Sequence, residues 1–591
     1  EGVNVPVVSH ETGQWAAYPD YDIIRKFRGY LRPGNYEIFR DSLARHGMAA
    51  RNKDFAWASG KFQVQAYKEE IEANLRTPGL MGYQLLDLHD YLGQGTALVG
   101  VLDTFWQSKG YATAEEFRRF NGQTVPLARL LKRTWTTDET LTAEVEIAHF
   151  GAAPLVDAQP WWKLLDATGR VAASGDFARR TVGIGKNIPL GQIRLPLAAL
   201  VAPQAYRLLV GIAGVADSAA NTLAENDWNI WLYPAKIAAP EPADVLVTHS
   251  WPAAEAALAA GGKVLFLPLA SDLDWSGPPL DSVPVFWNRL MNPAWSRTLG
   301  VWIDTKHPAL TQFPTDRFND WQWSELIKGT RTVNVDKLPP ALQPIAQPID
   351  DWNRNFKLGL LLEAKVGEGR LMVATPDLQT NLDKRVVARQ LRKSVLDYMA
   401  SDSFNPQTAV TAVEFRKALF DTLVMRKLGA QADGGNNPAN AIDGDPNTFW
   451  SAGMPQALTI SFSAPASFSG LLIMPRQNHR EHEGDVRAYL IETSDDGDHW
   501  RELKRGALVS TYEQQRVEFG RDVSARRLRF TALSGFGNDN TATIAELALL
   551  YTGAALPENS GGVTYRRVRA ASSDIDENLG PAPTPQARTV D

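Results

Sequence analysis

The hydrophobic pattern of this 591-residue chain changes its period three times, near residues 125, 240 and 410. Before residue 125, short apolar runs alternate with helix-length segments, which is typical of β/α units. Residues 126–235 alternate apolar and polar side chains, which predicts half-buried strands. An α/β pattern returns over 243–402, and strands dominate 410–552. Because each period suits a different fold, we predict a multidomain chain with α/β and all-β parts, as its length also indicates.

In the first region, 1–125, polar side chains follow two predicted buried strands. The valine-rich run 4–10 predicts one strand of a parallel sheet, and 81–86 predicts the other. The polar residues that follow these strands include Glu11, Asp87, His89 and Asp90. Helices are predicted over 21–28, 36–46, 53–76 and 114–120. In β/α folds the chemistry lies at the carboxyl ends of the strands, so these polar residues are candidates for a site.

The remaining regions have their own patterns. For 126–235 we expect an antiparallel sandwich of immunoglobulin-like size, followed by a Pro/Ala linker at 234–242. For 243–402 we expect a doubly wound α/β domain. The Gly-, Pro- and Ser-rich tail at 553–591 is expected to be flexible.

Composition excludes several functions. The chain has no cysteine, which excludes disulfides, zinc-thiolate sites and cysteine nucleophiles. Its formal net charge of -6 argues against a nucleic-acid partner. No apolar run is long enough to predict a membrane span. The first residue is Glu1 and no targeting segment is visible, so we expect a chain that is processed or truncated at its start.

Two strings in the first region carry a resemblance to a known family. SHETGQWAAYPD, at 9–20, and GYQLLDLHDYLGQGTALVGVLDTFW, at 82–106, resemble the end of the catalytic (β/α)8 barrel in glycoside hydrolase family 2-type enzymes. The resemblance implies that Glu11 is the nucleophile of a retaining exo-glycosidase of the β-galactosidase or β-glucuronidase kind. It also implies a sugar pocket lined by His10, Trp15, Asp87, His89 and Asp90.

The chain departs from this family in length. A full barrel takes about 250 residues, and only about half of that precedes the sandwich. A retaining enzyme also needs a second, protonated carboxyl about 5–5.5 Å from the nucleophile, and the resemblance places it near the missing fourth strand. We therefore expect the N-terminal half of the same enzyme, or a partner chain, to complete the site. Alone, the chain is expected not to hydrolyse glycosides.

Simpler roles stay open for these residues. Glu11 could be a strand-end carboxylate paired with an arginine such as Arg51 or Arg76. His89 and Asp90 could form a structural hydrogen-bonded pair instead of contacting substrate.

The α/β block carries a second resemblance. DVLVTHSWPAAEAALAAGGKVLFLP, at 244–268, and DDWNRNFKLGLLLEAKVGEGRLMVATPDL, at 350–378, resemble the amidotransferase-like domain appended to some family 2 enzymes. A working amidotransferase of that class needs a cysteine nucleophile. Because the chain has none, the resemblance implies a scaffold.

The third resemblance covers 410–552. NAIDGDPNTFWSA, IETSDDGDHW and RLRFTALSGFGNDNTATIAELALL resemble the discoidin-type, or coagulation factor type C, jelly roll found in many carbohydrate-binding modules. The family often holds a structural calcium ion, which prefers oxygen ligands. The ligands that the resemblance implies are Asn440, Asp443, Asp445, Thr448, Ala545 and Glu546. The alternative is an Asp-Gly turn in which Asp443 and Thr448 act as local caps.

Two loops of this region are further candidates. The segments 476–483, which contains His479 and His482, and 535–540 could bind a sugar or an acidic glycan. The alternative is a pair of solvated polar loops, and no third metal ligand accompanies the two histidines.

Three hypotheses for the function follow. The first is the C-terminal portion of a retaining exo-glycosidase that acts on oligo- or polysaccharide. The second is a non-catalytic carbohydrate-binding or adhesion protein with a barrel remnant as scaffold, and the third is a purely structural assembly domain. The resemblance implies a secreted or periplasmic bacterial protein.

Overall fold

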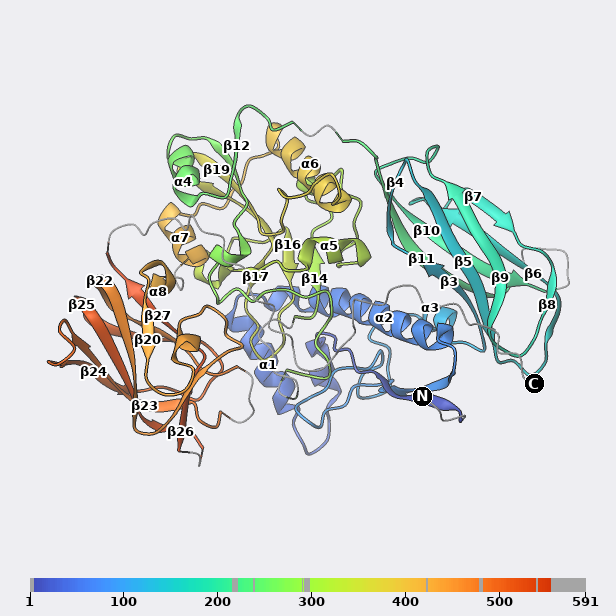
Figure 1. Ribbon diagram of the computed structural model, residues 1–591. Coiled ribbons are helices and arrows are strands. Elements are labelled where there is room, and N and C mark those ends of the chain that lie inside the picture. Colours follow the sequence, from blue (N-terminus) through green and yellow to red (C-terminus); the bar gives the residue numbers. More distant parts are fainter. Residues whose placement is uncertain are drawn as a thin grey trace, which may run out of the picture. The chain divides into compact units, whose positions relative to one another are not determined.

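The computed structural model describes residues 5–214, 222–237, 240–289, 291, 298–420, 424–477, 482–537 and 540–553. Figure 1 labels the elements formed by these residues. The tail that we expected to be flexible lies outside the described residues from position 554 onward.

The first region contains a small parallel sheet. β1 (Val7–Gly13) pairs in parallel with β2 (Leu80–Leu86), with Gly13 opposite Leu86. Between and after them lie a 3-10 helix (Tyr21–Lys26), α1 (Gly34–Arg45), a 3-10 turn (Ala49–Arg51), α2 (Asn52–Arg76) and α3 (Ala114–Phe120). Both predicted strands and all four predicted helical segments are confirmed, the first as a 3-10 helix. The expected barrel is not: within the described residues this sheet has two strands.

Local chemistry explains the helices. α3 begins with a capping box, in which the Thr113 hydroxyl accepts the Glu116 N–H and the Glu116 carboxylate accepts the Thr113 N–H. α2 buries Phe55, Tyr67 and Ile71 on one side. This helical spacing lets a single face of α2 pack against the sheet and its neighbours.

Residues 124–233 form two packed sheets. β3 (Thr124–Leu130), β5 (Thr140–His149) and β9 (Gly185–Pro196) make one antiparallel sheet. The second has the order β4-β11-β10-β6-β7, with β8 on β6. Its strands are β4 (Thr134–Thr136), β6 (Leu155–Leu165), β7 (Val171–Asp176), β8 (Arg180–Val182), β10 (Gln204–Ala213) and β11 (Thr222–Tyr233). Val145 and Ile147 of the first sheet share a core with Leu208 and Trp228 of the second, so the two sheets pack face to face; the likeness to an immunoglobulin domain stays a prediction.

The α/β block has a mixed sheet of order β12-β13-β19-β18-β16-β14. Its strands are β12 (Val245–Thr248), β13 (Lys263–Phe266), β14 (Val301–Ile303), β16 (Ala346–Pro348), β18 (Leu361–Val366) and β19 (Gly369–Ala374). α4 (Trp251–Ala259) packs on the face of Val264 and Phe266, whereas α6 (Val386–Ala400) packs on that of Leu265. Helices therefore cover both faces, as in an α/β domain.

The strand directions correct the doubly wound expectation. β12, β13 and β19 are parallel, whereas β18 is antiparallel to β19, β16 to β18 and β14 to β16. The cause is local: only Gly367 and Glu368 separate β18 from β19, and a two-residue connection allows only an antiparallel hairpin. Shorter elements complete the block: α5 (Ser324–Ile327), β15 (Val333–Asn334), β17 (Leu358–Gly359) and 3-10 turns at Ala270–Asp272, Pro308–Leu310, Trp321–Trp323 and Val335–Lys337.

The C-terminal region is an all-β jelly roll preceded by α7 (Ala412–Phe420) and α8 (Val424–Lys427). Its main sheet has the order β20-β22-β25-β23-β24, with β27 also on β22, and β21 pairs with β26. The bounds are β20 (Gln431–Asp433), β21 (Trp450–Gly453), β22 (Gln456–Met474), β23 (Val486–Ser494), β24 (Arg501–Ala507), β25 (Gln515–Gly535), β26 (Thr541–Ile544) and β27 (Glu546–Tyr551), with a 3-10 turn at Pro438–Ala441. Trp450 lies in its core.

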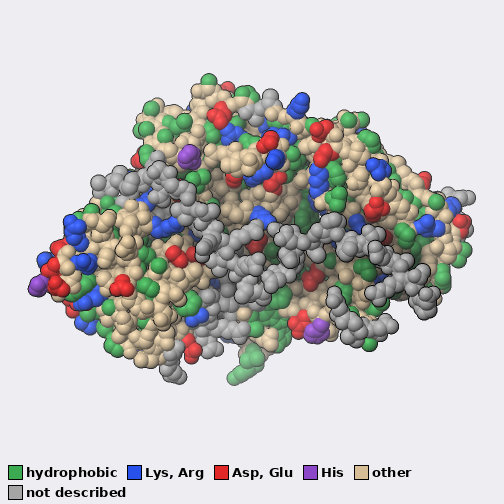
Figure 2. Space-filling view, in the orientation of Figure 1, with side chains coloured by type: hydrophobic (Ala, Val, Ile, Leu, Met, Phe, Trp, Pro, Cys, Tyr) green, Lys and Arg blue, Asp and Glu red, His purple; other side chains and the backbone are tan. Residues whose placement is uncertain are grey.

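Two surface features bear on partners. Among the described residues, no helix has the length and apolar character needed to cross a membrane. On the face shown in Figure 2, lysine and arginine side chains are interspersed with aspartate and glutamate.

Candidate functional site

Glu11 lies inside β1, at an irregularity of the register between Ser9 and Thr12. Its φ of 54° is in the left-handed region, which is uncommon for a residue with a side chain and suggests a functional constraint. Its carboxylate is half exposed; Oε2 accepts a hydrogen bond from Gln14 Nε2 at 3.1 Å, and Oε1 lies 3.8 Å from His10 Nδ1.

The arginines named as alternative partners of Glu11 pair elsewhere. Arg51 lies 3.4 Å from Asp54, and Arg76 lies 2.8 Å from Glu72. The carboxylate of Glu11 is therefore not committed to either guanidinium.

The second strand brings Asp87 and His89 to the same edge. Because Gly13 is opposite Leu86 in the parallel pair, Asp87 follows β2 where β1 ends. His89 is half-buried; its Nδ1 lies 2.8 Å from the Asp90 carbonyl, and its ring centre lies 4.4 Å from that of Trp106. Trp106 is 62% exposed, and the predictions from sequence did not single it out.

Asp90 lies in a buried, hydrogen-bonded environment. It is buried, and its Oδ1 accepts hydrogen bonds from Lys109 Nζ at 2.6 Å and from the Gly100 N–H at 3.2 Å. Burial raises the pKa of Asp90 to about 6, against the opposing charge of Lys109. This arrangement favours the structural alternative for Asp90 over a substrate contact.

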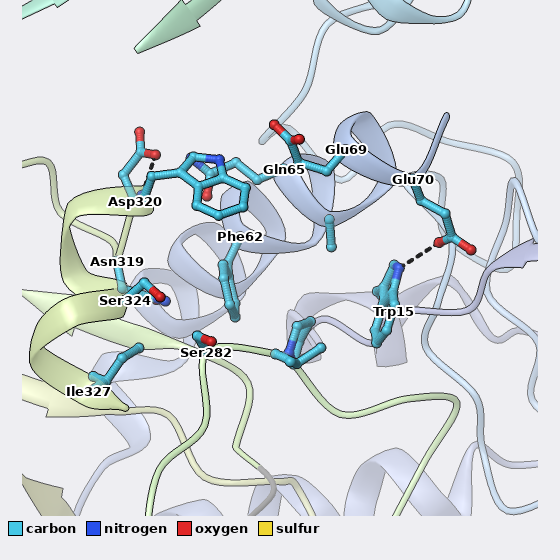
Figure 3. A pocket seen from close by; sticks show the side chains of 14 residues that line it. Trp15, Phe62, Gln65, Glu69, Glu70, Ser282, Asn319, Asp320, Ser324 and Ile327 are labelled. Atoms are coloured by element: carbon cyan, nitrogen blue, oxygen red, sulfur yellow. Dashed lines mark hydrogen bonds between the residues drawn. The ribbon is translucent and has the colours of Figure 1, made fainter. Parts of the chain in front are cut away.

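Trp15 lines a cavity of about 430 Å³ that Figure 3 shows from close by. Its indole N–H donates to Glu70 Oε2 at 2.9 Å, and the same oxygen accepts the Gly13 N–H at 3.1 Å. Burial raises the pKa of Glu70. Glu70 comes from α2, and neither its spacing nor its neighbours in sequence could have placed it beside Trp15.

The implied calcium ligands come together in the jelly roll. The Thr448 hydroxyl donates to Asp443 Oδ2 at 2.9 Å and lies 3.1 Å from the Asp445 carbonyl and 3.5 Å from the Asn440 carbonyl. Ala545 is buried, and its N–H donates to the Met474 carbonyl.

Glu546 brings a buried carboxylate to this turn, beside the half-buried Asp443. It shares a hydrogen bond with Asp443, and its Oε1 has no hydrogen-bond partner among the described residues. Burial, followed by the charge of Asp443, raises the pKa of Glu546 well above its ordinary value. Two neighbouring carboxylates, one of them buried with an unpaired oxygen, suit a hard cation.

The described residues hold no group of three or more histidine, aspartate or glutamate side chains arranged as a metal site. The fit to calcium therefore rests on two carboxylates, a hydroxyl and backbone carbonyls. Of the candidate loops, residues 478–481, including His479, and residues 538–539 lie outside the described part of the chain. His482 lies 2.9 Å from Asp485 and stacks on Tyr512.

Comparison with protein families assigns three segments. Residues 428–547 match the F5/8 type C domain. Residues 139–234 and 246–420 match two domains of unknown function, DUF8488 and DUF8487. The α/β block thus matches a domain of unknown function, and the resemblance to an amidotransferase-like domain stays a prediction. None of these three models covers residues 1–138.

A curated relative is named a sialidase, from Micromonospora viridifaciens. It is 30% identical over 218 residues, which is 35% of this chain and 32% of that protein. The chain therefore spans about a third of the length of this relative.

Solved structures also resemble the chain. One is a Clostridium perfringens module, CpGH89CBM32-5, in complex with GalNAc-β-1,3-galactose, at 22% identity over 22% of this chain and 97% of that chain, with a TM-score of 0.19. Another is the family 32 carbohydrate-binding module of C. perfringens NanJ in complex with galactose, at 25% identity over 21% and 94%, with a TM-score of 0.19. From this family match, residues 428–547 form an F5/8 type C, or discoidin-type, domain.

Proposed function

We propose that the chain binds carbohydrate through its F5/8 type C domain. The observation that carries this proposal is the match of residues 428–547 to that domain, whose discoidin-type fold occurs in many carbohydrate-binding modules. A distant relative named as a sialidase also supports a carbohydrate-related function. A secreted or periplasmic location in a bacterium would suit such a protein.

We further propose that calcium stabilises this domain. Asp443 and Glu546 would hold the ion with their carboxylates, and Asn440, Asp445, Thr448 and Ala545 would add carbonyl or hydroxyl oxygens. A bound cation would neutralise the like charges of Glu546 and Asp443, which the fold places side by side. The turn at 440–448 would then be fixed beside β27.

A glycan microarray tests the binding function. The full chain is applied with calcium, with a chelator, and as the variant Glu546→Gln. We expect retention on a subset of glycans, weakened by the chelator and by the variant. A correctly folded chain, shown by circular dichroism, that is retained by no glycan in calcium would contradict the proposal.

A second function, glycoside hydrolysis, is favoured by the geometry of Glu11. Its carboxylate is half exposed, uncommitted to the two candidate arginines and at the edge where β1 and β2 end. In a retaining mechanism it would attack the anomeric carbon while a second carboxyl protonates the leaving oxygen. That second carboxyl would come from the N-terminal half of the enzyme or from a partner chain.

The faces of the two-stranded sheet support such a partner. Val7, Val8 and Met81 are 49%, 57% and 59% exposed. Apolar side chains on strands that lack a cover are typical of a surface that packs against further polypeptide. We propose that additional barrel strands bury them and bring the missing acid.

A covalent probe tests this second function. The chain is combined with its N-terminal half and treated with a 2-deoxy-2-fluoro glycosyl fluoride, which traps retaining nucleophiles. We expect the label on Glu11 by peptide mass spectrometry. A label on another carboxylate of an active complex would reassign the nucleophile.

A further inference from the structure

The cavity beside Trp15 has aromatic walls from three separate parts of the chain. Trp15 follows β1 and Phe62 comes from α2 (Figure 3). Trp321 comes from the 3-10 turn Trp321–Trp323 of the α/β block. Trp15 is held in place by Glu70 and by an edge-to-face contact with Phe286 at 5.8 Å. A cavity of about 430 Å³ with such walls lies within the usual range for small-molecule sites.

Polar side chains also line the cavity. They are Gln65, Glu69, Glu70, Ser282, Asn319, Asp320 and Ser324. Glu70 uses Oε2 for its bonds to Trp15 and Gly13, which leaves Oε1 to accept from a ligand. Flat apolar faces and a few hydrogen-bonding groups match a sugar ring, which has C–H faces and hydroxyl edges.

The acidic residues of the cavity lining favour neutral sugars over acidic ones. Glu69, Glu70 and Asp320 border the cavity, and its lining includes no lysine or arginine among the described residues. Glu69 is paired with Arg133 at 2.6 Å. Asp320 and Glu70 are held instead by neutral donors, such as Asn229 Nδ2 at 2.7 Å from Asp320. An acidic ligand would meet like charges that no cation of the lining offsets.

We propose that this cavity is a binding subsite for an uncharged sugar ring, which stacks on the aromatic walls and donates hydroxyl hydrogen bonds to Glu70. The proposal rests on the carbohydrate function proposed above and adds a second site, separate from the F5/8 type C domain. It also assigns specificity: neutral hexosides enter the cavity, whereas uronic and sialic acids are excluded.

Oxidative footprinting tests the proposal. Trp321 is 43% exposed at the cavity, and Trp162, half-buried in β6 of the sandwich, is not part of the lining and serves as the internal reference. The full chain is oxidised with methyl β-galactoside, methyl β-glucoside, glucuronic acid or N-acetylneuraminic acid, and each tryptophan peptide is quantified. We expect a saturating neutral glycoside to slow Trp321 oxidation about threefold or more, because a pocket covers most of its ligand, with Trp162 unchanged.

A matched pair of variants localises the effect. Ala66→Phe fills the cavity from α2, whereas Ala73→Phe places the same ring on an exposed position of the same helix. The first variant should abolish protection of Trp321 and the second should retain it. The proposal would be overturned if protection survived Ala66→Phe, if it extended equally to Trp162, or if no neutral glycoside protected Trp321.

Glu70→Gln tests the charge argument without filling the cavity. The amide oxygen still accepts from Trp15, but the negative charge is gone. We expect acidic sugars to begin to protect Trp321 in this variant. Equal protection by neutral and acidic sugars in the unmodified chain would refute the assigned specificity.

The two proposals fail separately. Loss of glycan-array binding in Glu546→Gln concerns the F5/8 type C domain, and Trp321 protection concerns the cavity. Array binding without protection would leave the first function intact and remove the subsite, and protection without array binding would do the reverse.

Discussion

Buried carboxylates in this chain differ in what offsets their charge. Glu72 of α2 is fully buried and lies 2.6 Å from Lys68, 2.8 Å from Arg76 and 3.0 Å from Trp228 Nε1. Burial alone would raise the pKa of Glu72, but the charges of Lys68 and Arg76 lower it. For Glu546, burial and the charge of Asp443 act in the same direction.

Removing Glu72 should therefore be costly. Glu72→Ala leaves two cations and an indole N–H without their acceptor, and we expect a loss of about 3–5 kcal/mol in the free energy of unfolding. Urea denaturation followed by circular dichroism measures it. The control is Glu502→Ala, which removes an exposed ion pair with Arg505 and should cost less than about 1 kcal/mol. Equal losses in the two variants would contradict this account of Glu72.

Glu546 makes stability depend on pH and calcium. Because its folded-state pKa lies above its ordinary value of 4.5, the folded chain binds the proton more tightly than the unfolded chain. In chelator, its contribution to stability is present at low pH and is lost as pH rises through the folded-state pKa. Calcium takes the place of the proton and should reduce this loss.

Thermal unfolding from about pH 5 to 8 measures the effect. Glu546→Gln cannot titrate, so its stability in chelator should fall less with pH than that of the unmodified chain, and calcium should no longer raise it. A calcium-induced rise of the melting temperature that persists in Glu546→Gln would place the ion elsewhere.

The sequence could predict a residue's place in the site only where the local sequence around that residue indicated it. Glu11, Asp87 and Trp15 follow predicted strands, so their places were within reach of the sequence. Glu70 and Trp321 meet Trp15 through folding of segments that lie far apart, and no local pattern encodes that meeting. Asp90 was assigned two roles because its partner Lys109 follows an irregular loop.

At the scale of elements, α2 contains a glycine whose replacement by alanine should lower the stability of the fold, although this substitution in a helix usually raises it. Alanine for a mid-helix glycine ordinarily stabilises by about 1 kcal/mol. A Cβ at Gly60 would lie 2.3 Å from the buried ring of Tyr111, which is fixed by a 2.6 Å hydrogen bond to Gln63. We expect Gly60→Ala to destabilise by about 1–3 kcal/mol through overpacking.

Gly34→Ala is the matched control, because a Cβ at this first residue of α1 meets no atom within 4 Å. It should leave the urea midpoint unchanged or raised. If Gly60→Ala also raised the midpoint, the close packing of Tyr111 on α2 would be wrong.

The positions of helices and strands along the chain were more predictable than the directions of the strands in their sheets. The helices and strands follow from periodicity, which is why 53–76 and 114–120 closely match α2 and α3. β18 alternates buried and half-buried side chains and β19 is mostly buried, and such burial patterns are the same in either strand direction. The short link at 367–368, not the hydrophobic pattern, carried the evidence for an antiparallel pair.

At the scale of the whole molecule, the patterns predicted separate folds but not the cores between them. Trp275, Phe356 and Leu358 of the α/β block form one buried cluster with residues of the F5/8 type C domain, namely Leu472, Met474, Ala545, Ala548 and Leu550. Arg289 adds a buried hydrogen bond to Gln477 at 2.6 Å. Such contacts join segments that lie far apart in the sequence, so no local spacing of residues predicts them.

This shared cluster predicts coupled unfolding. In calcium, calorimetry should give one transition for the α/β block and the F5/8 type C domain together, because neither can open without exposing the cluster. Trp275→Ala leaves a cavity in it, and we expect a loss of about 3–5 kcal/mol and a separate transition for the jelly roll. Trp228→Ala, which empties a site inside the sandwich core, should lower stability without that separation. Two transitions in the unmodified chain, or an unsplit one in Trp275→Ala, would show that the two domains unfold independently of this cluster.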